Sequence, residues 1–182
     1  MPTHDPFQTL ELPRRFDLTP AQIEGAYLKK AAASHPDLAA DTENAAEESS
    51  ALNRAKGTLL DPESRAHALL ALLEEGQGVS DADRKALPDG FLMEIMMTRQ
   101  EIEADLAGPD AQAKRKEWEA WGERQRDEHI ARVSELFSDA GESPEPDRLV
   151  SIRTALNAWR YVERLLEQLD PDYDPAQADF SG

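Results

Sequence analysis

A proline between two helical segments places the strongest constraint on how this chain can fold. Residues 34–37 are Ser-His-Pro-Asp, and the flanking segments 20–33 and 43–60 have the composition and apolar spacing of helices. Proline lacks a backbone N–H and clashes with the preceding turn, so the first helix must end before Pro36, and His35 is directed toward an extended conformation. The sequence therefore predicts a helical hairpin whose rigid, exposed bend presents the imidazole of His35 beside the carboxylate of Asp37.

This bend is better suited to docking than to catalysis. Nothing beside His35 and Asp37 has the pattern of a nucleophile or a second base. We therefore expect a protein that is not an enzyme and that presents the bend to a partner.

The rest of the chain also has helical patterns, without a strand-like alternation of useful length. Two helix starts combine a capping residue with proline, at Asp5-Pro6 and Thr19-Pro20. The first of these helices is predicted to end at about Leu12, and a later helix is predicted over about 111–140. Glycine or proline ends the later segments, and the last one carries apolar residues at alternating spacings of three and four: Ile152, Ala155, Trp159, Val162, Leu166 and Leu169. The sequence predicts an all-α protein with a hairpin domain over residues 1–76, a linker over 77–89, an antiparallel three-helix bundle over 90–169 and a loose tail over 170–182.

Composition and charge exclude several classes of partner and cofactor. The 182 residues carry a net charge of −17, which disfavours nucleic acid and anionic membrane surfaces. There is no apolar run of membrane-spanning length and no signal-peptide pattern, so we expect a cytoplasmic protein. Cysteine is absent, and the four histidines are scattered without ligand spacing. We therefore expect no metal site and no cofactor.

The hairpin resembles the J domain of DnaJ-type co-chaperones. The resemblance rests on the tripeptide at 35–37 and on its context, which comprises residues 7–13, 26–30, 52–55 and 59–62. It implies that His35, Pro36 and Asp37 contact a DnaK-type ATPase chaperone and promote its ATP hydrolysis. Lys29 and Lys30 would lie on the exposed face of the preceding helix and meet an acidic surface of that chaperone. Leu38 stands where a lysine commonly follows the tripeptide.

The second half of the chain resembles HscB, the J protein of iron–sulfur assembly. The residues that carry this resemblance are 64–70 and 91–94, together with the last helix, so that it covers about residues 5–169. It implies a DnaK/HscA-type chaperone as one partner and an iron–sulfur scaffold protein (IscU-like) as the client of the bundle.

The helix predicted over 90–107 has two apolar faces. Phe91, Ile95, Ile102 and Leu106 fall within an arc of about 60°, which is enough to seal the helix into a bundle. A second arc carries Leu92, Met93, Met96 and Met97. Periodicity leaves two interpretations open: a helix buried on both sides, or a helix with an adaptable binding face, where methionine is common.

The resemblance to HscB favours the binding face. Leu92, Met93 and Met96 match the family's apolar contacts for the scaffold, and Tyr161 matches an aromatic position on the last helix that joins the same surface. Met97, Gln100 and Ala104 occupy positions where the family has acidic groups. We include Met97 and Gln100 in the predicted client surface. Two alternatives remain: a J-domain co-chaperone for a different client, and an interaction protein whose J-like domain no longer engages a chaperone.

Overall fold

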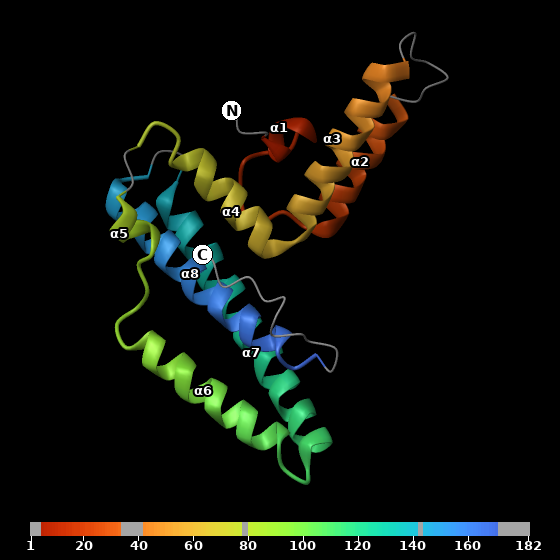
Figure 1. Ribbon diagram of the computed structural model, residues 1–182. Helices are drawn as coiled ribbons and strands as arrows, with labels where there is room; N and C mark the ends of the chain where they lie inside the picture. Colours follow the sequence, from red (N-terminus) through yellow and green to blue (C-terminus); the bar gives the residue numbers. More distant parts are fainter. Residues whose placement is uncertain (1–4, 34–41, 78–79, 142–143, 171–182) are drawn as a thin grey trace. The chain divides into compact units, whose positions relative to one another are not determined.

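All the regular secondary structure in the described part of the chain is helical. The computed structural model describes residues 5–33, 42–77, 80–141 and 144–170 (Figure 1). Within these ranges there is no strand, which confirms the all-α prediction. The helices are α1 (Pro6–Thr9), α2 (Pro20–Ala33), α3 (Thr42–Leu60), α4 (Pro62–Leu73), α5 (Asp81–Arg84), α6 (Phe91–Leu106), α7 (Ala111–Ala140) and α8 (Pro146–Glu167).

The chain divides into two compact units. Unit 1 contains Met1–Val79 and Ser134–Ile152, and unit 2 contains Ser80–Val133 and Arg153–Gly182. The break between residues 79 and 80 falls inside the predicted linker, whereas residues 134–152, which we had assigned to the bundle, group with the N-terminal part. The predicted domain boundaries therefore stay a prediction.

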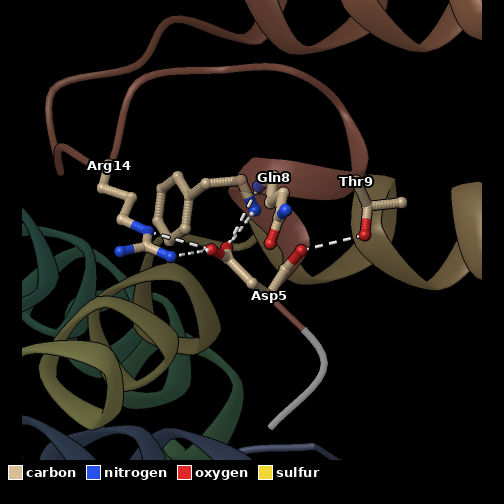
Figure 2. Close-up of polar contacts among 5 residues, drawn as sticks. Asp5, Gln8, Thr9 and Arg14 are labelled. Carbon is tan, nitrogen blue, oxygen red and sulfur yellow. Dashed lines mark hydrogen bonds and ion pairs between the residues drawn. The ribbon is translucent and has the colours of Figure 1, made fainter. Parts of the chain in front are cut away.

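Unit 1 begins with a short helix that is closely capped. The Asp5 carboxylate accepts hydrogen bonds from the backbone N–H groups of Phe7 (2.9 Å) and Gln8 (3.1 Å), and Arg14 Nε donates to its second oxygen at 2.9 Å (Figure 2). The predicted start is therefore present. The helix ends at Thr9, although the sequence predicted a helix to about residue 12, because the chain turns tightly and Glu11 adopts a left-handed φ of 52°.

Helices α2 and α3 lie side by side as the predicted hairpin (Figure 1). A reciprocal pair of bonds starts α2: Thr19 N–H donates to Gln22 Oε1 at 2.9 Å, and Gln22 N–H donates to Thr19 Oγ1 at 3.3 Å. Between the helices, Tyr27 Oη donates to Asn53 Oδ1 at 2.9 Å, and Lys56 Nζ lies 4.7 Å from the centre of the Tyr27 ring. The bend itself, residues 34–41, lies outside the described residues.

A buried arginine connects the later parts of unit 1. Arg65 of α4 donates to the carbonyl of Leu59 at 2.6 Å, and its guanidinium lies 5.0 Å from the centre of the Phe16 ring. Phe16 in turn stacks on Phe137, with ring centres 5.6 Å apart. This column explains why the C-terminal end of α7 groups with the N-terminal residues in unit 1.

Unit 2 is built on α6, α7 and α8. Its buried cluster comprises Ile95, Ile102, Val162, Leu165 and Leu169, against which Phe91, Leu106, Trp118, Trp121, Tyr161 and Leu166 pack. The Asn157 amide on α8 donates to the carbonyls of Arg84 (3.0 Å) and Ala86 (2.8 Å), so the segment after α5 is tied to α8.

The apolar face of α8 is wider than the predicted seam. Ile152, Trp159, Val162 and Leu169 are buried as predicted, while Ala155 and Leu166 are only partly buried. Leu156 and Leu165, which the seam omitted, are buried. The reason is geometric: a straight helix in a globular unit buries an arc of about 100° or more, whereas alternating spacings of three and four describe the narrow contact line of a coiled coil.

Candidate functional site

The structure describes only two of the five predicted chaperone-docking residues. His35, Pro36 and Asp37 lie outside the described residues. Lys29 and Lys30 lie near the C-terminal end of α2, with Lys30 in its last turn, and they differ in environment. Lys29 is exposed, whereas Lys30 is partly buried and forms an ion pair of 2.5 Å with Glu11.

The ion pair between Lys30 and Glu11 joins α2 to the turn after α1. The hydrogen bond and charge of Lys30 lower the pKa of the Glu11 carboxyl, which is exposed to solvent. Solvent screens such a pair, so its contribution to folding is small. The pair fixes the position of the Lys30 ammonium group beside Glu11, so any partner that contacts Lys30 has to displace this carboxylate.

One exposed apolar side chain on α2 was not singled out from the sequence. Leu28 is 65% exposed and lies next to Lys29. Leu28 falls outside the helical face that carries Ile23 and Tyr27, and this position could have predicted its exposure from the sequence. Single exposed leucines are ordinary on protein surfaces, so Leu28 adds no site by itself.

The second apolar arc of α6 is at the surface. Leu92 is 51% exposed, Met93 66%, Met96 53% and Met97 56%, and Gln100 is exposed beside them. The interpretation in which α6 is buried on both sides therefore does not hold for these residues. Large apolar side chains gathered on one exposed helical face are typical of interaction surfaces.

The other arc of α6 holds the helix in place. Ile95 and Ile102 are buried against α8, as the sequence predicted. At the start of α6, Phe91 meets Tyr161 edge to face, with ring centres 6.1 Å apart and an interplanar angle of 75°. Tyr161 is thus partly buried, and its ring supports the end of α6 where the exposed arc begins.

Charged groups border the exposed arc of α6. At about 100° per residue, Arg99 and Glu103 fall along one edge and Glu94 and Glu101 along the other. Arg99 Nε pairs with Glu103 at 2.9 Å. Ala104 also lies within the arc and is exposed. Protein-binding surfaces commonly combine an apolar centre with a polar border.

The described ranges contain neither a candidate metal site nor a candidate membrane-spanning helix. There, no group of three or more histidine, cysteine, aspartate or glutamate side chains could hold a metal ion. None of the helices in those ranges has the length and apolar character needed to cross a bilayer.

Comparisons with known proteins agree with both halves of the fold. A family model of the DnaJ domain matches residues 5–68. The co-chaperone protein HscB homolog of Bordetella pertussis is 31% identical over 175 residues, covering 93% of this chain and 96% of that protein. The crystal structure of human co-chaperone protein HscB has a TM-score of 0.70 at 27% identity, covering 93% of this chain and 82% of that chain. Chaperone HscB from Vibrio cholerae shares the fold, with a TM-score of 0.69 at 21% identity over 91% of this chain and 94% of that chain.

An N-terminal DnaJ domain followed by a helical bundle defines a J-domain co-chaperone. The similarity to the Bordetella protein extends over nearly the full length of both chains. This chain belongs to the HscB family of co-chaperones. Co-chaperones are not an enzymatic class, and they act through other proteins.

Proposed function

We propose that this chain is a cytoplasmic co-chaperone in iron–sulfur cluster assembly. In this proposal, the loop of His35, Pro36 and Asp37 stimulates the ATPase of a DnaK/HscA-type chaperone. Lys29 and Lys30 contribute to docking on that chaperone. The exposed arc of α6 binds an iron–sulfur scaffold protein (IscU-like) and delivers it, and the cluster belongs to that client.

The observation that carries the client assignment is the exposure of α6. Leu92, Met93, Met96 and Met97 are each more than half exposed, although the same helix buries Ile95 and Ile102 on its other side. Unbranched methionine side chains adapt to an irregular partner surface. Because Gln100 and Ala104 are uncharged here, the affinity would rest on apolar burial more than on charge.

The ATPase role is tested by changing His35 to glutamine. The variant should keep its helical content and lose stimulation of the chaperone ATPase, because Pro36 and the flanking helices determine the backbone while the imidazole makes the contact. Steady-state ATP hydrolysis by a DnaK/HscA-type chaperone, with and without this chain, measures the effect. Unaltered stimulation by the variant would exclude the J-domain mechanism.

The client role is tested by replacing Leu92, Met93 and Met96 with alanine together. Because these side chains are exposed, the folded state should lose little stability, whereas a complex would lose its apolar centre, and such central residues commonly contribute about 2 kcal/mol or more. A titration with an IscU-like scaffold should show a weakening of at least about 30-fold, by the conversion of about 1.4 kcal/mol per tenfold.

The matched control is Ile95→Ala on the buried arc of the same helix. It should lower the melting temperature, since large-to-small changes in a core cost roughly 2–5 kcal/mol, and it should spare binding per folded molecule. Tyr161→Ala should act like the triple variant but more mildly. A triple variant without a cooperative melt would place these side chains in the core and refute the client surface.

A further inference from the structure

Nearly all the sulfur of this chain is concentrated on one exposed surface. The sequence has no cysteine and four methionines. Three of these, Met93, Met96 and Met97, lie on α6 and are each more than half exposed. Any oxidant that reacts with sulfur in the folded protein will therefore meet this surface first, apart from Met1.

The three methionines form a single patch. Met93 is three residues from Met96 and four from Met97, which places its side chain next to both of theirs on one face of the helix. Leu92 adjoins Met96 by the same rule. The opposite side of α6 is held by Ile95 and Ile102, so a chemical change at the methionines does not touch the residues that pack the helix.

We propose that Met93, Met96 and Met97 are a modification site, at which oxidation to methionine sulfoxide turns off client binding. This inference rests on the proposed client surface and adds its regulation. The oxidant is a peroxide. A thioether sulfur attacks one peroxide oxygen, the O–O bond breaks, an S–O bond forms and water leaves, so sulfur is oxidised by two electrons and the peroxide is reduced.

The change is reversible by known chemistry of this side chain. A methionine sulfoxide reductase returns the thioether, with the sulfoxide oxygen leaving as water while a dithiol becomes a disulfide. Because this chain has no cysteine, peroxide cannot form disulfides or sulfenic acids in it. Methionine is the side chain in which reversible sulfur oxidation of this protein can occur.

Oxidation changes the property on which binding depends. A sulfoxide is polar and accepts hydrogen bonds from water. Burying it against an apolar partner surface removes these hydrogen bonds without replacing them, which is unfavourable. On the free protein the same group stays solvated, because the side chain is exposed. The modification therefore acts against the complex and leaves the fold of α6 in place.

The experiment uses the full chain treated with hydrogen peroxide, which is then removed before an IscU-like scaffold is added. Peptide mass spectrometry should find sulfoxide at positions 93, 96 and 97, and titration should show binding weakened at least about tenfold. Sulfoxide reductase with a dithiol should restore the affinity. Circular dichroism should show the same helical content before and after treatment.

The decisive variant replaces Met93, Met96 and Met97 with leucine. It has an apolar, helix-forming surface without sulfur, so its affinity for the scaffold, measured before and after peroxide treatment, should not change. A matched variant with glutamine at the three positions supplies a polar side chain and should bind as weakly as the oxidised protein.

Two outcomes overturn the inference and can be told apart from failure of the proposed function. Equal affinity of oxidised and untreated chain would refute the switch while leaving the client surface intact. If peroxide weakens scaffold binding equally in the leucine variant and in the natural chain, the loss of binding comes from oxidation of another residue. If the untreated chain itself fails to bind the scaffold, the proposed client is wrong, and the switch falls with it.

Discussion

Gly122 of α7 lies where α7 and α8 approach closely, and its replacement by alanine is a sensitive test of unit 2. A Cβ atom at this position would lie 1.8 Å from Leu166 Cδ2, 2.9 Å from its Cγ and 3.0 Å from its Cδ1. Carbon atoms in contact normally stay about 3.5–4.0 Å apart. Because the branch point Cγ is itself too close, rotating the end of the Leu166 side chain cannot relieve the overlap.

The expected cost combines two effects of opposite sign. Overpacking a well-packed site costs typically about 1–3 kcal/mol. Replacing glycine by alanine inside a helix returns about 1 kcal/mol of helix propensity. The net change for Gly122→Ala is therefore a loss of up to about 2 kcal/mol, which corresponds to several degrees in melting temperature for a chain of this size.

Gly57→Ala provides the matched control. Gly57 lies in the interior of α3, is exposed, and a Cβ atom there would meet nothing within 4 Å. The same substitution should therefore stabilise by about 1 kcal/mol. Since the propensity gain is common to both variants, the difference between them isolates the overpacking cost at Leu166, about 1–3 kcal/mol.

Urea denaturation measures both changes. Tryptophan fluorescence reports on unit 2, because Trp118, Trp121 and Trp159 all lie in it, and far-UV circular dichroism reports on all the helices. In a Leu166→Ala background, Gly122→Ala should cost less than it does in the natural chain, because the overlapping side chain is absent there. Equal stability changes for the two glycine variants would refute the close packing of α7 against α8.

Three further changes test the polar contacts of the fold. Glu163→Ala should cost about 1–3 kcal/mol, because it removes the acceptor of buried Trp159 Nε1 (2.8 Å) and the partner of Arg126 Nε (2.7 Å), and Glu163→Gln should cost less in the same urea assay. Burial lowers the pKa of His129 below its ordinary 6.5, so stability should fall as pH drops below that value, and His129→Gln should flatten this pH dependence. Asp5→Ala should lower stability by about 0.5–2 kcal/mol through loss of the α1 cap, measured by thermal melts.

Local signals in the sequence were enough to predict most helix boundaries. The bounds of α2 and α7 agree with the predicted ones, because proline, glycine and capping side chains act over a few residues and leave little to tertiary structure. Gly76 and Gly141 have φ values of 82° and 69°, as predicted for helix ends. The early end of α1 was missed, since the left-handed conformation of Glu11 has no glycine or asparagine to indicate it.

The spacing of apolar residues could not predict side-chain contacts between segments that are far apart in the sequence. Arg65 belongs to the motif that carries the resemblance to HscB, yet nothing local indicates that its guanidinium lies over Phe16 or that Phe16 stacks on Phe137. The same holds for Lys30, whose predicted exposure is reduced by a partner nineteen residues earlier in the sequence, Glu11. Such pairs depend on the tertiary arrangement, which spacing along one helix does not contain.

For helix α6, the sequence pattern does not determine which of two apolar arcs is buried, and the structure does. Both of its arcs are apolar, so periodicity alone gives them equal claim to the core. The structure separates them: Ile95 and Ile102 pack against Val162 and Leu165, while Met93 and its neighbours face solvent. β-branched isoleucine is stiff and suits a fixed core, whereas flexible methionine suits a surface that must adapt to a partner. The stiff residues thus lie on the arc that packs against α8, and the flexible methionines lie on the exposed arc, which suits the client surface proposed there.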